Sequence, residues 1–203
     1  IMPSLVGSEM CIRDRLISAL LVIAAAIPLG ILLTRQSTQF LAPVVTGIAN
    51  IGQAAPVVGV IVLLAIWLGF GTPVAILGLW FYAFLPVLAN VIAGLRGVDK
   101  QLIEAAHGLS MSPMQVLAKV ELPLALPVIM TGVRTSLVLL VGAGAFATFI
   151  DAGGLGGLIT SGINLYRTPI LVSGAVLIAA LALTVEWVGR LLELAFTPKG
   201  MIK

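Results

Sequence analysis

The sequence predicts an all-α, polytopic membrane protein with about five transmembrane helices. Of the 203 residues, 60% are hydrophobic and only 9% are charged, and the mean hydropathy is +1.20. A soluble domain of this size could not bury so many apolar side chains in its core. The apolar residues also form long runs, several of them near the length of about 20 residues that a helix needs to cross a bilayer. One polar stretch, residues 99–127, interrupts these runs.

Charge and residue usage exclude several classes of function. The net charge is +3, but the basic residues are scattered, so no nucleic-acid partner is predicted. The chain has one cysteine, Cys11, and one histidine, His107, so neither an internal disulfide nor a metal site built from these residues is predicted. No serine lies in a Gly-x-Ser-x-Gly elbow and no nucleotide-binding motif is present, so we predict no catalytic residues and no enzyme activity.

The first segment, residues 1–15, differs from the rest of the chain. It has no hydrophobic periodicity, and it crowds three charges into Arg13-Asp14-Arg15. Its string SEMCIRDR resembles the translated sequencing-adaptor read-through that can precede environmental gene fragments. A targeting signal fits less well, because the basic residues do not precede a short apolar core with a small-residue cleavage site. We therefore predict that residues 1–15 are non-native, that the true N-terminus is missing, and that residues 16–203 form the membrane domain.

The first two apolar runs predict one plain span and one broken span. Leu16–Thr34 carries no charge and is long enough to cross a bilayer core of about 30 Å. Phe40–Gly69 is punctuated by prolines and glycines, and a break is predicted near Gln53 to Pro56. A break inside lipid must face protein or a water-lined cavity. Two interpretations stay open: a kinked helix within the bundle, or a pathway-lining segment that includes Asn50, Gln53 and Pro56.

The next two runs each contain one polar residue whose role has to be explained. Pro73–Leu95 carries Asn90 near its end, and we predict a helix–helix hydrogen bond there, with substrate contact as the alternative. Leu124–Ile150 would extend over about 40 Å as a helix, so part of it tilts or projects from the bilayer. Within it, Arg134 either snorkels to the nearer interface, which we favour, or requires a carboxylate or carbonyl partner. Both polar residues are candidate pathway residues.

A glycine-rich segment precedes the last predicted span. Asp151–Gly157 holds four glycines in seven residues, which favours a turn over a helix. It cannot cradle a phosphate in the P-loop manner, because no lysine follows at the required spacing. Pro169–Phe196 is the last apolar run, and its end carries Glu186, Arg190 and Glu193 at the helical spacing of an ion-pair strip.

The charge distribution predicts the orientation in the membrane. With five spans, one side receives nearly all of the basic residues after residue 15, and only Arg167 falls on the opposite side. The positive-inside rule makes the richer side cytoplasmic, together with the polar stretch and the C-terminus. The basic residues on that side are Arg35, Arg96, Lys100, Lys119, Arg190, Lys199 and Lys203.

Within the polar stretch, local signals predict two short helices on the membrane surface. Asp99 can cap the first helix, whose apolar residues recur on one face. Ser112, Pro113 and Gln115 form a capping box with proline at the first helical position, so a second short helix is predicted to run to about Val120 before the next span begins. The apolar face of the first helix consists of Leu102, Ile103, Ala106 and Leu109.

Two motifs in this stretch, Glu104-Ala105-Ala106 and Val120-Glu121-Leu122-Pro123, resemble the EAA loop of permease subunits of ATP-binding-cassette importers. The pattern in that family is Glu-Ala-Ala, three residues, Gly, nine residues, Ile, any residue and Leu-Pro. In this chain Ser110 takes the glycine position and Val120 takes the isoleucine position. If the turn needs a left-handed backbone, serine costs roughly 1 kcal/mol there. Gly108 is expected to take over part of that role.

This resemblance implies a mechanism for residues 97–123, which we call the coupling loop. In such importers the EAA helix docks into a groove of a separate ATPase subunit, which binds ATP and Mg²⁺, and transmits its closure to the spans. This chain is expected to bind no cofactor itself. Small alanines allow close approach, and the glutamate can accept hydrogen bonds or pair with a base. The implied coupling residues are Glu104, Ala105, Ala106, Gly108, Ser110, Val120, Leu122 and Pro123.

Longer segments are similar to permeases of importers for quaternary-amine osmoprotectants such as glycine betaine, choline and carnitine. The segments are PLGILLTR, IANIGQAAPVVGV, KVELPLALPVIMTGVRTS and DAGGLGGLI, the last with Asp151 at the first glycine position of a GAGGLG stretch. The resemblance implies a bacterial or archaeal cytoplasmic membrane, an ATPase, an extracellular or periplasmic substrate-binding protein, and a second, identical or related permease. The alternatives are a permease for methionine or another amino acid and, from another class, a non-ABC channel or a structural membrane protein.

Overall fold

The computed structural model describes residues 3–35, 38, 40–150 and 154–196, and within these ranges the chain is helical without strands. Four of the described helices are long and apolar enough to cross a membrane, and the bent pair α2 and α3 provides a fifth candidate, which confirms the predicted fold class. The elements are α1 (Pro3–Leu33), α2 (Ala42–Ala54), α3 (Val57–Leu68), α4 (Thr72–Arg96), α5 (Lys100–Gly108), α6 (Pro113–Val116), the π-helical turn η1 (Leu117–Glu121), α7 (Leu122–Gly144), the 3₁₀ turn η2 (Phe146–Ile150), α8 (Gly156–Asn164) and α9 (Thr168–Phe196).

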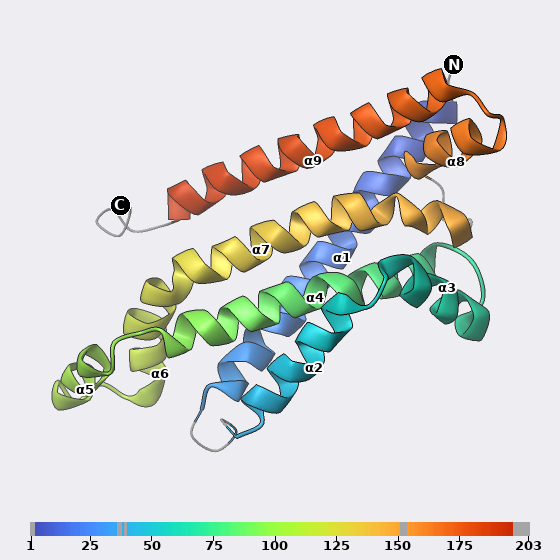
Figure 1. The fold of residues 1–203 in the computed structure, drawn as a ribbon. Coiled ribbons are helices and arrows are strands. Elements are labelled where there is room, and N and C mark those ends of the chain that lie inside the picture. Colours follow the sequence, from blue (N-terminus) through green and yellow to red (C-terminus); the bar gives the residue numbers. More distant parts are fainter. Residues whose placement is uncertain (1–2, 36–37, 39, 151–153, 197–203) are drawn as a thin grey trace.

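Helix α4 forms the centre of the bundle (Figure 1). It packs against α1 and α7, and α2 and α3 also lie against it, whereas α9 packs against α7 and α8. The helices α5 and α6 lie together at one end of the molecule, and α3 and α8 lie towards the other (Figure 1). We call the first of these the coupling-loop end.

Very close helix contacts hold α1 and α7 against α4. A Cβ atom at Gly30 of α1 would lie 2.5 Å from Cγ1 of Val91, and one at Gly132 of α7 would lie 2.5 Å from Cβ of Asn90. Membrane helices gain little from apolar burial against each other, so small residues that permit close backbone approach contribute much of the packing. The two glycines therefore set how tightly the central three helices associate.

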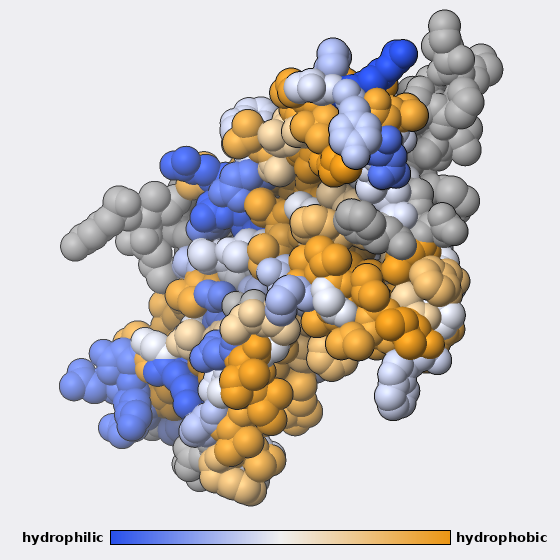
Figure 2. Space-filling model, turned by 45° about the vertical axis from the view of Figure 1, so that its right-hand side comes forward, coloured by the Kyte–Doolittle hydropathy of each residue, from blue (hydrophilic) through white to orange (hydrophobic). Residues whose placement is uncertain are grey.

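The molecular surface is mainly apolar between the two ends. Figure 2 shows hydrophobic residues over much of the visible face, with hydrophilic residues at the coupling-loop end, at the opposite end and midway along the left edge. Helix α9 is largely uncovered by the rest of this chain, and only 6% of its candidate span is buried. An apolar surface of this kind suits a bilayer and neighbouring spans rather than water.

The predicted break in the second span is confirmed. Helix α2 ends at Ala54, α3 begins at Val57, and the two helices are bent by 94°. Ala55 is extended with ψ 137°, as expected for a residue that precedes a proline, and Pro56 caps α3. Because Pro56 has no N–H, the helix cannot continue regularly through it.

The prediction that the second short helix ends near Val120 is wrong. Helix α6 continues through η1 into α7, so the surface helix and the span form one uninterrupted helix. The cause lies at Pro123, which cannot donate a backbone hydrogen bond and whose ring crowds the preceding turn. The chain widens into a π-helical turn instead of breaking, and the N–H of Leu122 donates to the carbonyl of Leu117, five residues back. The predicted span 124–150 also ends earlier, at Gly144, before η2.

The prediction of a turn over residues 151–157 is partly wrong. Residues 151–153, including Asp151, lie outside the described residues, but α8 already begins at Gly156. Glycine is required there because a Cβ atom at Gly156 would lie only 2.0 Å from the carbonyl oxygen of Ala145. The glycines therefore serve close packing as well as chain reversal. The predicted last span is confirmed as α9.

The first helix extends further towards the N-terminus than the predicted span. Helix α1 begins at Pro3, so the backbone of most of the segment 1–15 continues the helix that crosses the bundle. The predicted non-native origin of that segment stays a prediction. The C-terminal residues 197–203 lie outside the described residues.

Candidate functional site

The first half of the coupling loop folds as its sequence signals predict. The side chain of Asp99 accepts a hydrogen bond of 2.9 Å from the backbone N–H of Gln101, which satisfies one of the free donors at the start of α5. Helix α5 then runs for nine residues from Lys100 to Gly108. Such a short helix depends on its caps and on packing rather than on its own propensity.

The turn after α5 is a Schellman motif with serine in the position that usually holds glycine. Ser110 has φ 59°, its N–H donates to the carbonyl of His107 at 2.9 Å, and the N–H of Met111 donates to the carbonyl of Ala106 at 3.3 Å. The left-handed backbone anticipated for the glycine slot is therefore present in Ser110. Gly108 does not share this role, because it lies inside α5 and has no positive φ.

A Ser110→Gly variant is expected to stabilise the folded turn after α5 slightly. Glycine removes the cost of about 1 kcal/mol that serine bears in a left-handed backbone conformation. The larger conformational entropy of glycine in the unfolded turn offsets about half of this gain. Backbone amide exchange at Met111 should therefore slow by roughly twofold. A Ser110→Ala variant keeps a Cβ atom and is the matched control. Equal exchange rates in the glycine and alanine variants would contradict the assignment of strain to this residue.

The second half of the loop begins with the predicted capping box. The N–H of Gln115 donates to the hydroxyl of Ser112 at 3.4 Å, and the N–H of Ser112 donates to Oε1 of Gln115 at 2.9 Å. Pro113 occupies the first helical position, where its missing N–H has no consequence. Val116, at the end of this helix, is fully buried.

The two halves of the loop and the start of α7 line an open apolar groove of about 440 Å³. Ala106 is only 4% exposed and faces its own chain. Of the two alanines, only Ala105 is exposed and can be approached closely by a partner. Glu104 is also exposed, whereas Val120, Leu122 and Pro123 are partly buried. The groove is lined by Leu102, Ala105, Ala106, Leu109, Met111, Lys119, Val120, Pro123 and Leu124.

Glu121 lies inside the EAA-like motif and forms an ion pair that no sequence signal indicated. Its carboxylate accepts two hydrogen bonds from the guanidinium of Arg35, from Nη2 to Oε2 at 2.5 Å and from Nη1 to Oε1 at 3.4 Å. Arg35 lies two residues past the end of α1, and Glu121 is the last residue of η1. The pair thus joins the end of the first span to the coupling loop.

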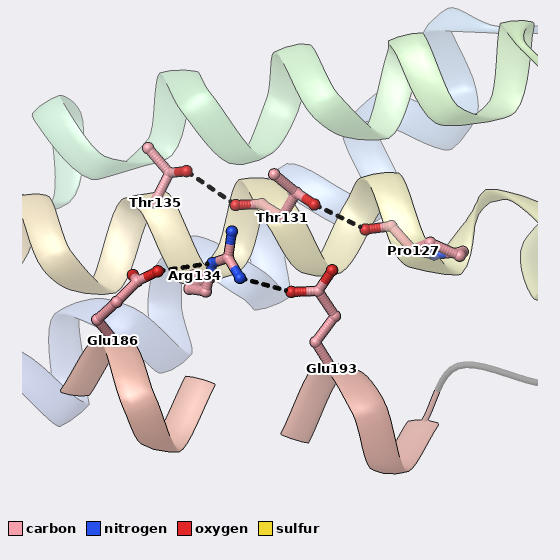
Figure 3. A network of polar contacts seen from close by, with 6 residues as sticks. All are labelled: Pro127, Thr131, Arg134, Thr135, Glu186 and Glu193. Atoms are coloured by element: carbon pink, nitrogen blue, oxygen red, sulfur yellow. Dashed lines mark hydrogen bonds and ion pairs between the residues drawn. The ribbon is translucent and has the colours of Figure 1, made fainter. Parts of the chain in front are cut away.

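Arg134 on α7 has the carboxylate partners that the alternative prediction required. Its snorkelling to an interface depends on where the bilayer lies and stays a prediction. Its guanidinium lies between two glutamates of α9, with Nε 3.2 Å from Oε1 of Glu186 and Nη1 2.9 Å from Oε2 of Glu193 (Figure 3). Gly189 makes room for it, because a Cβ atom there would lie 3.0 Å from Cγ of Arg134. The glutamates of the predicted strip along α9 therefore pair with Arg134 across the interface of two helices.

The α7 helix carries a further ladder of hydroxyl contacts beside Arg134. Thr135 donates to the carbonyl of Thr131 at 2.9 Å, and Thr131 donates to the carbonyl of Pro127 at 3.0 Å (Figure 3). Each hydroxyl bonds a carbonyl four residues back in its own helix, so these polar groups are satisfied without a partner on another helix.

The other candidate pathway residues lie on separate helices. The side-chain amide of Asn90 donates to the carbonyl of Pro86 at 2.8 Å, so this bond lies within α4 and is not the predicted helix–helix bond. Asn50 on α2 and Pro56 at the break are exposed in this chain. The side chain of Gln53 lies outside the described residues. A pathway role for these residues stays a prediction.

Comparisons with known proteins agree with this arrangement. Residues 26–197 match the family described as "Binding-protein-dependent transport system inner membrane component". The chain is 42% identical over 186 residues to the choline transport system permease protein OpuBB of Bacillus subtilis (strain 168), which covers 92% of this chain and 85% of that protein. It is 41% identical over 184 residues to the carnitine transport permease protein OpuCB of Listeria monocytogenes, with 91% and 84% covered.

The fold is also similar to a solved structure. A chain of the MetNI methionine ABC transporter in an inward-facing conformation superposes with a TM-score of 0.82 at 27% identity, covering 97% of this chain and 98% of that one. The family match spans most of the sequence, and the structural match spans nearly all of it. This chain therefore belongs to the family of binding-protein-dependent transport system inner membrane components.

Proposed function

We propose that this chain is the membrane-spanning permease subunit of an ATP-driven importer for quaternary-amine osmoprotectants such as choline, carnitine and glycine betaine. The observation that carries the cargo class is the identity of about 40% to permeases named for choline and carnitine transport, over about nine tenths of the chain. A permease of this kind forms the path through the membrane and takes its energy from a separate ATPase.

The coupling loop is the proposed docking element for that ATPase. Helix α5 presents Glu104 and Ala105 outward, next to the apolar groove that the loop lines. A short helix with an exposed carboxylate and an apolar flank suits a partner groove that carries a basic residue. In this proposal ATP and Mg²⁺ bind to the partner subunit, and the permease itself hydrolyses nothing.

The remaining partners and the orientation follow from the same proposal. Cargo is delivered by an extracellular or periplasmic binding protein, and a second permease, identical or related, completes the pathway. The coupling-loop end faces the cytoplasm, together with the C-terminus. Basic residues support this orientation, because Arg35, Arg96, Lys100 and Lys119 lie in or next to the coupling loop or at the end of α1 that is tied to it.

A methionine or other amino-acid permease is the alternative, and the structural likeness to a methionine transporter favours it as the second candidate. The likeness in sequence separates the two, since identity is 27% to the methionine transporter chain and 42% to the choline permease. Overall fold is shared widely among permeases and does not identify cargo.

Uptake into proteoliposomes tests the proposal. The complete complex with its ATPase and binding protein, with ATP inside the vesicles, should accumulate labelled choline, carnitine or glycine betaine and not labelled methionine. Vesicles that contain ADP instead of ATP are the control for passive leakage. ATP-dependent uptake of methionine alone would replace the proposed cargo class with the alternative, and equal uptake with ADP would indicate a channel.

A further inference from the structure

The ion pair between Arg35 and Glu121 has a geometry that surface ion pairs seldom have. The two terminal nitrogens of the guanidinium each donate to one oxygen of the carboxylate, which is the bidentate arrangement that only arginine can form. The side chain of Glu121 is 11% exposed, and that of Arg35 is 35% exposed. An exposed pair contributes little, but a largely buried carboxylate that loses the cation paired with it is costly to leave behind.

Glu121 lies at the turn where the long helix is least regular. Glu121 is the last residue of η1, the one turn of the long helix from Pro113 to Gly144 that is widened. Directly after it, the N–H of Leu122 reaches back five residues, and Pro123 donates no backbone hydrogen bond. A π-helical turn next to a proline is a place where a helix bends most easily. The Arg35 side chain therefore holds the helix at its weakest turn.

The coupling helix packs against the same turn from another direction. Helix α5 contacts η1 and α6, and Ala106 is buried at this contact, which leaves the groove between the two halves of the loop. A displacement of α5 is thus transmitted to η1 through packed side chains. From η1 the displacement can continue along α7, because the two elements form one helix. It can reach α1 directly from η1 through the Arg35–Glu121 pair.

We propose that Arg35 and Glu121 are positioning residues that tie the end of α1 to the π-helical turn of the coupling loop, so that α1 moves together with α5 and α7 during the transport cycle. This inference rests on the proposed coupling to an ATPase. It gives α1 a direct link to the coupling loop, in addition to the packing of α1 against α4 and α7.

The first test measures cargo moved per ATP hydrolysed by the complete complex in proteoliposomes. Arg35→Gln and Glu121→Gln should each lower this ratio by about threefold or more, while ATP hydrolysis per assembled complex continues. The double variant should be no worse than either single variant, because both remove the same tie. Arg35→Lys keeps the charge but loses the bidentate contact, so its ratio of cargo to ATP should be intermediate. Arg167→Gln, an exposed arginine between α8 and α9, is the matched control and should leave the ratio unchanged.

A merely structural pair would lower the amount of assembled complex and leave the ratio of cargo to ATP intact. Unchanged ratios in both single variants, or losses that add in the double variant, would therefore overturn the proposal.

A second test does not depend on the identity of the cargo. Spin labels are placed at two exposed positions, Leu32→Cys on α1 and Gln101→Cys on α5, in the complete complex with Cys11 replaced by serine. In the otherwise unaltered protein the distance between the labels should stay the same with and without bound ATP, because the tie moves both helices together. With Arg35→Gln the distance distribution should broaden or shift on ATP binding. Labels that separate in the unaltered protein, or that behave identically in Arg35→Gln, would overturn the proposal even if none of the tested cargoes is transported.

Discussion

A Glu104→Arg variant is expected to abolish ATP-driven transport while the chain still inserts into the membrane. Glu104 is exposed on α5, so reversal of its charge buries no new charge within the described chain. A partner surface that accepts a carboxylate would face a like charge instead, which weakens docking by about 2 kcal/mol or more, roughly thirtyfold in affinity. Co-purification of the ATPase and uptake into proteoliposomes measure the two consequences.

Two control variants separate docking from folding of the loop. Gln101→Ala, on the same helix and also exposed, should retain ATPase binding. Ala106→Asp should also stop transport, but for another reason, since Ala106 is buried and an unpaired carboxylate there opens the contact between α5 and the second half of the loop. Faster amide exchange throughout residues 100–111 is expected in Ala106→Asp and not in Glu104→Arg. Normal uptake by the Glu104→Arg complex would refute the docking role.

An Arg134→Leu variant is expected to lower the stability of the assembled helices substantially. The substitution leaves Glu186 and Glu193 without the cation that lies between them. Loss of one partner from a fully buried pair costs about 3–5 kcal/mol. The side chains here are 25%, 42% and 23% exposed, so we expect a smaller loss, about 2 kcal/mol. Thermal unfolding in detergent should then occur roughly 5 °C lower.

Partial restoration by removal of one remaining charge provides the control. The double variant Arg134→Leu and Glu186→Leu removes one of the two carboxylates that lose the guanidinium, and it should recover part of the lost stability, because apolar residues can replace partly buried ionic groups at little cost. Arg134→Lys should fall between the two, since a single ammonium cannot reach both glutamates as the guanidinium does. If Arg134→Leu alone melted at the original temperature, the cluster would not contribute to stability.

Features controlled by near neighbours in the sequence could be predicted. The cap at Asp99, the capping box at Ser112 and the break before Pro56 each depend on residues within about four positions, where side-chain and proline effects act directly on the backbone. The left-handed turn was placed correctly at Ser110 by the spacing of the motif, and Gly108 was wrongly given a part in it.

Features that depend on neighbouring helices could not be predicted. Arg35 and Glu121 are 86 positions apart, and Arg134 and Glu193 are 59 apart, so nothing in one sequence indicates that their helices lie side by side. Helix α8 was missed for a related reason. Its glycines lower helix propensity locally, but Gly156 is needed for the approach to Ala145, and packing overrides the propensity.

The continuous helix from Pro113 to Gly144 joins the second half of the coupling loop to the fourth membrane crossing in one lever, and the Arg35–Glu121 pair braces the lever at η1, its most easily bent turn. At about 1.5 Å per residue the lever is roughly 48 Å long. A tilt of about 5° at the water-exposed arm would shift the opposite tip by roughly 4 Å, which is close to the width of a methyl group. A partner that moves the short arm only slightly could thus open or seal a passage on the far side of the membrane, without any unfolding in between.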